Sequence, residues 1–279
     1  MLTASQHMSK KQLVAIYIFI SFGVILCLFP LYWMMLSSMR TLRDIYVQPP
    51  MLLPIHLNFS NYQELLRTTG FTRSIINSLF IALSVTMLNL LFCSMGGFGF
   101  AKYSFKGKYL LFRLLLITMM IPWVNTIIPS FIMISRIGLI DKYFALILPS
   151  MVSAWGIFLM RQYILSIPDE LLDAARIDGC SEYHIYAMIV VPLTKPAFVT
   201  VGIFCFLGSW NNFLWPLLVL RSNSKLTFPL MLSVLATSQW IEPYHLISAG
   251  CFLATIPIIL IFFAMQRHFI TGFTQGAIR

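Results

Sequence analysis

Acidic side chains are concentrated in one stretch of the sequence, residues 168–192, which holds five of the nine Asp and Glu residues. Ionised carboxylates accept charge-assisted hydrogen bonds from Arg and Lys, so this stretch can bind a basic partner surface. It also contains Ala174 and Ala175, whose small side chains permit close approach, and Gly179, which permits a sharp turn. The five acidic residues are Asp169, Glu170, Asp173, Asp178 and Glu182.

The local sequence predicts two short helices joined by that turn. Pro168 favours a first helical turn, and the acids beside it suit the positive end of a helix dipole. Gly179 can adopt the left-handed conformation that ends a helix. Ser181 can then cap a second helix, which we expect to stop at Pro192. The residues expected on one face of this second helix are Tyr183, Tyr186, Ile189 and Val190.

Polar and aromatic side chains inside long apolar runs form a second candidate site. Asn211, Asn212 and Trp215 lie within about one helical turn, where an amide can hydrogen-bond sugar hydroxyls and an indole can stack on a sugar face. The alternative is structural, because Trp and Asn near the end of a span also anchor helices at the interface or bond to neighbouring helices. Further, weaker candidates for a substrate path are Asn77, Trp123 and Asn125.

Several kinds of chemistry have no support in the sequence. The run from Gly96 to Gly99 lacks the Lys-Ser/Thr of a phosphate loop, and there is no His-Glu-x-x-His motif. No acidic residue falls in the core of an apolar run, although ion-driven carriers normally need ionisable groups there. The five cysteines form no CxxC pair. We therefore expect no catalytic residues, no metal site and no cofactor bound by this chain.

The elements that must position both sites are membrane helices. Hydrophobic residues make up 59% of the 279 residues and charged residues 10%, with a mean hydropathy of +0.84. A spanning helix needs about 20 largely apolar residues. The sequence predicts an all-α polytopic membrane protein with six spans, forming a single domain over residues 1–279, with a helix-turn-helix loop at about 165–196. The expected spans are 13–36, 74–100, 114–134, 143–160, 197–220 and 246–266.

The net charge of +10 does not indicate nucleic-acid binding, because the basic residues are spread singly along loops that can face anionic lipid. Six spans place both termini on one side of the membrane. The loops expected on that side carry 11 of the 19 Lys and Arg residues. By the positive-inside rule this bias favours cytoplasmic termini and a cytoplasmic acidic loop.

The acidic loop resembles the EAA motif of ABC importer permeases, which reads Glu-Ala-Ala, three residues, Gly, nine residues, then Ile-x-Leu-Pro. Asp173 replaces Glu and Val191 replaces Leu, and the spacing is kept. The resemblance extends over nearly the whole chain and is closest to the smaller partner of the maltose-type sugar permeases, including arabino-oligosaccharide permeases. The matching residues in the loop are Asp173, Ala174, Ala175, Gly179, Ile189, Val191 and Pro192.

This resemblance implies that the loop docks into an ATPase subunit and transmits its closure to the spans. It also implies a sibling permease, an ABC ATPase dimer that uses ATP and Mg, an extracytoplasmic solute-binding protein that the 221–245 segment faces, a sugar substrate and the bacterial cytoplasmic membrane. The residues assigned to ATPase coupling are Asp173, Ala174, Ala175, Arg176, Asp178, Gly179, Ile189 and Pro192.

Two alternatives remain open at this point. Importers of glycerol 3-phosphate and of polyols share much of the same pattern. A phosphate would favour Arg or Lys in the substrate path, and this chain has neither at membrane depth. The sibling permease would have to supply that cationic side chain. An autonomous secondary carrier or channel is the alternative of a different class. It would move solute without ATP or partners.

Overall fold

The computed structural model describes residues 9–53, 57–237 and 243–276, and in these ranges the regular structure is entirely helical. The expected cytoplasmic ends, residues 1–8 and 277–279, and residues 238–242 of the predicted external segment lie outside the described residues. Contacts group the chain into two compact units. One contains residues 1–69 and 232–256, and the other residues 70–231 and 257–279. The single-domain organisation stays a prediction.

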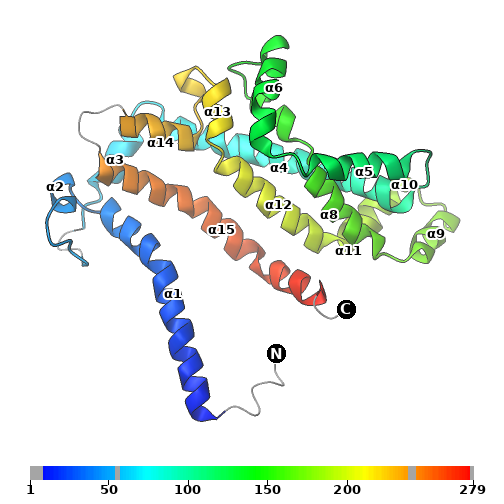
Figure 1. Cartoon of the computed structure of the whole chain (residues 1–279), viewed down its shortest axis with the longest axis horizontal. Helices are drawn as coiled ribbons and strands as arrows, with labels where there is room; N and C mark the ends of the chain where they lie inside the picture. The colour runs from blue at the N-terminus through cyan, green and yellow to red at the C-terminus, as the bar shows by residue number, and fades with distance from the viewer. Residues whose placement is uncertain (1–8, 54–56, 238–242, 277–279) are drawn as a thin grey trace. The chain divides into compact units, whose positions relative to one another are not determined.

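Three helices are long and apolar enough to cross a membrane by themselves (Figure 1). They are α1 (Lys10–Ser38), α4 (Phe71–Lys102) and the part of α15 (Tyr244–Gly276) that runs from Tyr244 to Met265.

Three further candidates are pairs of helices bent at a short break, and counting each pair as one span gives six, the number predicted. The bends measure 103°, 42° and 79° in chain order. The pairs are α5 (Lys108–Thr118) with α6 (Trp123–Arg136), α7 and η2 (Phe144–Ser150) with α8 (Ala154–Leu165), and the helix Glu182–Leu193 with α12 (Lys195–Trp210).

Two interruptions have local chemical causes. Pro122 precedes the first residue of α6, and a proline disfavours helical conformation in the residue before it. The expected span 197–220 is also interrupted, since three residues separate the end of α12 at Trp210 from the start of α13 (Leu214–Val219). The side chain of Asn212 accepts a hydrogen bond from Trp215 N at 3.4 Å, a local bond of the kind by which Asn competes with helix.

The core of the unit that contains residues 70–231 forms where α4 packs against α8 and α12. Gly97 of α4 lies so close to α8 that an added Cβ would be 2.7 Å from Met160 Cβ and 2.9 Å from Arg161 N. Small residues let helices approach closely, and Gly97 permits this contact between α4 and α8. The same core continues into the acidic loop through Leu172, Ile185 and Val190.

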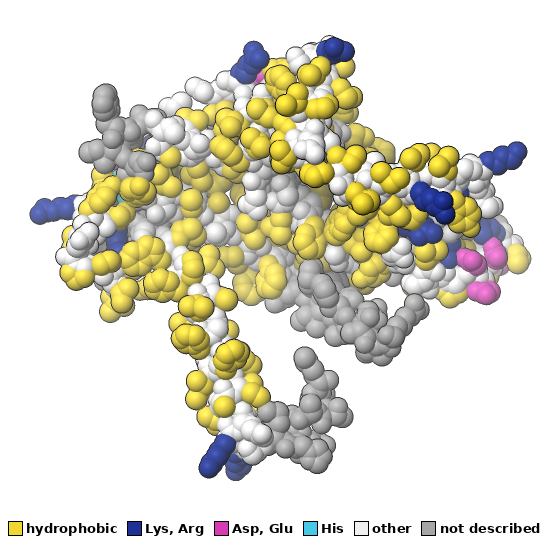
Figure 2. All heavy atoms as spheres, viewed as in Figure 1, with side chains coloured by type: hydrophobic (Ala, Val, Ile, Leu, Met, Phe, Trp, Pro, Cys, Tyr) yellow, Lys and Arg dark blue, Asp and Glu magenta, His cyan; other side chains and the backbone are white. Residues whose placement is uncertain are grey.

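In the other unit, a buried amide holds the end of α1. Asn61, in α3 (Ser60–Arg67), donates from Nδ2 to Ser38 O and Arg40 O, both at 2.8 Å. Tyr62 OH lies 2.6 Å from Ser38 Oγ. Along α1 itself, hydrophobic side chains cover much of the face seen in Figure 2, and none of its most apolar 18-residue window is buried. Such a helix suits lipid or a neighbouring membrane helix.

Candidate functional site

The first half of the acidic loop forms the predicted helix and turn. Helix α9 (Asp169–Ile177) follows Pro168 and has two acids in its first turn. After it, Gly179 has a φ of +83°. Cys180 N donates to Ala175 O at 2.9 Å and Gly179 N donates to Arg176 O at 3.0 Å, the bond pair of a Schellman motif. The left-handed helix end predicted at Gly179 is confirmed.

The second half begins as predicted but ends differently. Ser181 Oγ accepts a bond from His184 N at the start of α10 (Glu182–Ile185). The helix then widens into a π turn over Tyr186–Val190 and continues through α11 (Val191–Leu193), so it passes Pro192 instead of stopping there. The extra residue of a π turn shifts the helical register. The predicted common face is therefore wrong at Tyr183, which is exposed, while Ile185 is fully buried.

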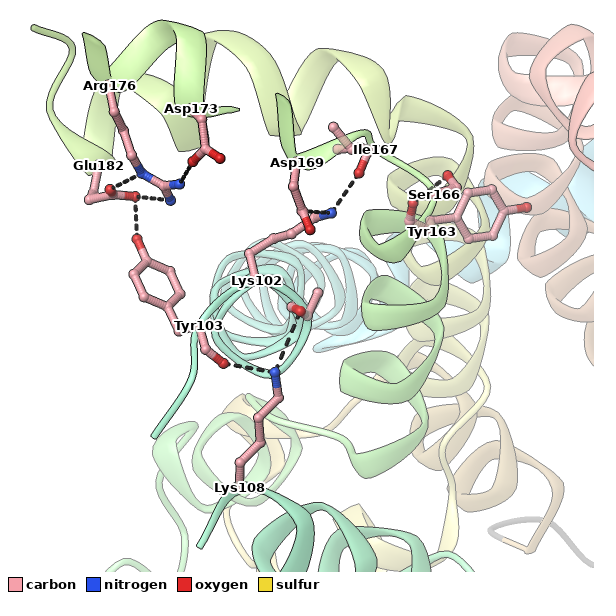
Figure 3. Close-up of polar contacts among 11 residues, drawn as sticks. Lys102, Tyr103, Lys108, Tyr163, Ser166, Ile167, Asp169, Asp173, Arg176 and Glu182 are labelled. Atoms are coloured by element: carbon pink, nitrogen blue, oxygen red, sulfur yellow. Dashed lines mark hydrogen bonds and ion pairs between the residues drawn. The ribbon is translucent and has the colours of Figure 1, made fainter. Parts of the chain in front are cut away.

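Arg176 joins the two helices across the turn (Figure 3). Its Nη1 donates to Asp173 Oδ1 at 2.7 Å, and its Nε donates to Glu182 Oε1 at 2.8 Å. The bond from Arg176, followed by one from Tyr103, lowers the pKa of Glu182. Glu182 is therefore ionised at neutral pH. The two helices and the turn, residues 169–193, form a braced unit that we call the hairpin.

The two faces of α9 differ in what they contact. Leu172 and Ala175 are buried in the core, whereas Ala174 is exposed and Ile177 is 86% exposed. Of the two alanines predicted to approach a partner, only Ala174 faces outward. It lies between Leu171 and Ile177, both exposed, and the three-residue spacing places these side chains in one row. We call Leu171, Ala174 and Ile177 the outer ridge.

Sequence reasoning missed Leu171 and Ile177, although their spacing around Ala174 was a readable signal. Among the other residues assigned to coupling, Asp178 and Pro192 are exposed. Ile189 is partly buried and packs against the core. The hairpin thus brings the assigned residues onto one short segment but turns Ala175 and Ile189 inward.

A hollow of about 350 Å³ lies beside α4, α8 and α12. Two of the predicted path residues, Trp123 and Asn212, line it, and they also line an adjoining hollow of about 80 Å³ together with Trp215. No charged side chain is among the described residues that line either hollow. Polar and aromatic lining residues that sequence reasoning missed include Asn89, Ser150, Ser153, Trp155 and Ser209.

The side chain of Asn89 is held in place by hydrogen bonds within the protein. Its Nδ2 donates to Ser150 O at 3.1 Å, and its Oδ1 accepts from Ser153 Oγ at 3.5 Å. The signal that could have found it is an isolated amide inside the apolar run of the second span, because a polar group at that depth needs a partner.

The remaining path candidates lie outside these hollows or are engaged in packing. Asn77 is buried, donates from Nδ2 to Ser224 O and Leu226 O at 3.1 and 3.0 Å, and accepts from Tyr143 OH at 2.8 Å. Trp215 is 5% exposed and donates from Nε1 to Ala145 O at 2.9 Å. The exposed residues Asn211 and Asn125 line neither hollow.

At the other end of α4, Asp141 holds the start of the predicted external segment. Its carboxylate accepts bonds from Arg221 N and Ser222 N, both at 3.0 Å, from Lys225 Nζ at 3.1 Å and from Ser222 Oγ. These bonds, those from Ser222 above all, hold the pKa of Asp141 far below its ordinary value. The segment continues into the short helix α14 (Phe228–Thr237).

A family model described as "Binding-protein-dependent transport system inner membrane component" matches residues 93–275, which include the hairpin and most of the residues that line the hollows. The chain belongs to this family. This permease is therefore a multi-pass component of the inner membrane and a transport subunit, not an enzyme. The predicted identity as an ABC importer permease and the all-α membrane fold are confirmed.

Individual relatives agree with this assignment. The permease is 38% identical over 262 residues to the arabinooligosaccharides transport system permease protein AraQ of Halalkalibacterium halodurans, covering 93% of this chain and 94% of the relative. It is 31% identical over 261 residues to the sn-glycerol-3-phosphate transport system permease protein UgpE of Escherichia coli, covering 91% and 93%.

A solved structure confirms the fold. A chain of a bacterial ABC transporter involved in the import of the acidic polysaccharide alginate superposes on the permease with a TM-score of 0.84 at 23% identity, covering 94% of the permease and 99% of that chain. Within the described part of the permease, no group of three His, Cys, Asp or Glu side chains converges.

Proposed function

We propose that this permease imports a sugar or oligosaccharide as one half of a permease pair, driven by an ABC ATPase dimer and supplied by an external solute-binding protein. The outer ridge carries the proposal. It is an exposed apolar row on a helix whose opposite face is fixed in the core by Leu172 and Ala175.

The outer ridge suits a cleft in the ATPase. Fully burying an Ile side chain contributes about 1.5–3 kcal/mol, and Ile177 is 86% exposed before docking. Asp173 is 63% exposed at its side chain and can accept a further bond from a basic residue of the ATPase. ATP and Mg belong to that partner, since this sequence contains no phosphate loop.

The larger hollow suits a neutral polyhydroxyl solute. Trp123 and Trp155 offer indole faces, while Ser209 and Asn212 offer hydroxyl and amide groups. The relation to AraQ supports an oligosaccharide. The relation to UgpE keeps glycerol 3-phosphate as the second candidate, and that solute would need a cationic side chain from the sibling permease, because none lines the hollow here.

Orientation follows from α4, whose 32 residues extend about 48 Å at 1.5 Å per residue. The hairpin lies at its Lys102 end, and the Asp141 contacts lie near Asn77 at its other end. The charge bias supports a cytoplasmic hairpin and cytoplasmic termini. The segment from Arg221 through α14 then faces the solute-binding protein.

The test is uptake by the reconstituted complex in liposomes, with Ile177→Asp compared against the wild type. We expect ATP-dependent, binding-protein-dependent sugar uptake by the wild type, and at least tenfold less ATPase co-purifying with Ile177→Asp. Lys106→Asp is the control, because Lys106 is exposed in the α4–α5 connection and lies outside the hairpin. Uptake by the permease alone, without ATP, would instead show an autonomous carrier or channel.

A further inference from the structure

The C-terminal end of α4 contacts the hairpin through two consecutive residues. Lys102 Nζ donates to Ile167 O at 2.5 Å and pairs with Asp169 Oδ1 at 2.6 Å (Figure 3). The next residue, Tyr103, donates from its hydroxyl to Glu182 Oε2. Asp169 is the first residue of α9 and Glu182 is the first residue of α10. Each helix of the hairpin is therefore held at its start.

The contact of Lys102 is made in a buried position. Its side chain is only 5% exposed, and a buried ammonium is costly unless it is paired and hydrogen-bonded. The carbonyl of Ile167 and the carboxylate of Asp169 supply those partners. The pairing lowers the pKa of Asp169, so this carboxylate is ionised at neutral pH.

Tyr103 contributes a neutral hydrogen bond. Burial, followed by the hydrogen bond and charge of Glu182, raises the pKa of Tyr103 to about 12. The phenol therefore stays protonated and donates a hydrogen bond to Glu182, which also accepts one from Arg176. The ring packs edge-on against Phe98 of α4, with centroids 5.3 Å apart.

The end of α4 is itself fixed within the membrane domain. Arg161 of α8 donates from Nε to Phe100 O at 3.1 Å, and Lys108 donates from Nζ to Tyr103 O at 2.7 Å. These bonds satisfy carbonyls that the end of a helix leaves open. A hairpin held at one point could pivot, whereas two contacts on a fixed helix end make the hairpin and α4 move together.

We propose that Lys102 and Tyr103 are positioning residues that fasten both helices of the hairpin to α4, so that α4 carries ATPase-driven movement to the larger hollow. This rests on the proposed function. Helix α4 reaches that hollow through Val85 and Asn89, and Asn89 lies about 20 Å along the helix from Lys102. The chain connection from the hairpin to α12 provides a separate route, bent by 79°.

The experiment measures solute molecules imported per ATP hydrolysed by the complete complex in liposomes. The variants are Tyr103→Phe, Lys102→Met and the double variant. Tyr103→Phe keeps the ring against Phe98, and Lys102→Met leaves Asp169 in solvent, where its side chain is already 76% exposed. We expect the ATPase to co-purify within twofold of wild type, while import per ATP falls at least fivefold in the double variant.

Matched controls separate this role from general structure. Lys106→Met and Tyr109→Phe alter the same residue types at exposed neighbouring positions and should keep the wild-type ratio. Lys102→Arg should recover part of the ratio. Asp169→Asn combined with Lys102→Met should lower the ratio of import to hydrolysis no further than Lys102→Met alone, because both substitutions remove the same ion pair.

The outcomes distinguish the two proposals. If the wild type shows no ATP-dependent uptake, the proposed function fails. If the wild type is active and both contact variants keep its ratio of import to hydrolysis, the role of Lys102 and Tyr103 is overturned. Loss of ATPase binding in Tyr103→Phe would also overturn it, because the residue would then serve docking instead of transmission.

Discussion

Arg176 and Glu182 lie on opposite sides of the Gly179 turn, and Arg176 Nε donates to Glu182 Oε1 at 2.8 Å. The same guanidinium also holds Asp173. One side chain thus fixes the angle between the two helices of the hairpin, while the outer ridge remains free of it.

Replacing Arg176 should loosen the hairpin locally. Arg176→Gln removes two partly exposed ion pairs worth about 0.2–1 kcal/mol each, so the overall stability changes little. We expect faster amide hydrogen exchange in peptides covering residues 169–185 and unchanged exchange over 108–118. Arg113→Gln, an exposed arginine of α5, is the control. Unchanged exchange at the hairpin would show that the ion pairs of Arg176 do not stabilise it.

Neighbouring glycines of α4 should respond oppositely to alanine. In Gly97→Ala the added Cβ would be 2.7 Å from Met160 Cβ, an overlap that should cost about 1–3 kcal/mol. In Gly96→Ala the nearest atoms belong to the flexible side chain of Ile157 at 3.4 Å, and helix propensity improves by up to about 1 kcal/mol. Thermal unfolding in detergent tests the pair, and equal melting temperatures would contradict the packing found here.

Asp141 should make stability depend on acid pH. The pKa of Asp141 is lowered in the folded state, so the unfolded state binds a proton more readily. The ionised carboxylate therefore stabilises the fold fully above the ordinary Asp pKa of about 3.9. This contribution declines as the pH falls below that value. We expect Asp141→Asn to lower the free energy of unfolding at pH 7 by about 1–3 kcal/mol, and with it the melting temperature. The difference from wild type should narrow toward pH 3. Glu170→Gln, exposed in α9, should show no such convergence.

Asn212 should affect solute affinity. Loss of one hydrogen bond to a sugar hydroxyl costs about 1.4 kcal/mol, so Asn212→Ala should raise the apparent KM of uptake about tenfold. Asn125→Ala serves as the matched control, because Asn125 is exposed and lines neither hollow. Equal KM values for both variants would remove Asn212 from the path.

The features predictable from sequence were those set by neighbouring residues. The start of α9 after Pro168, the turn at Gly179 and the cap at Ser181 depend on local backbone chemistry. The number of spans followed from length and composition. By contrast, the π turn that exposes Tyr183 interrupts the regular spacing on which the predicted face was based.

The contacts that could not be predicted join residues far apart in the sequence. Asn77 bonds to Leu226, and Lys102 bonds to Asp169, across 149 and 67 positions. Residue type alone made Asn77 a solute candidate, but in the folded chain its amide holds the backbone of Ser224 and Leu226. A single sequence contains no record of such pairings, so the positioning residues emerged only from the structure.

The outward-facing surface of α1 bears on how the protein is made. Its backbone hydrogen bonds are internal, and the side chains of its most apolar stretch do not depend on the rest of the chain for burial. This segment can therefore partition from the ribosome into lipid on its own, before the α4, α8 and α12 core has been synthesised. We therefore expect α1 to insert before the later spans pack against one another.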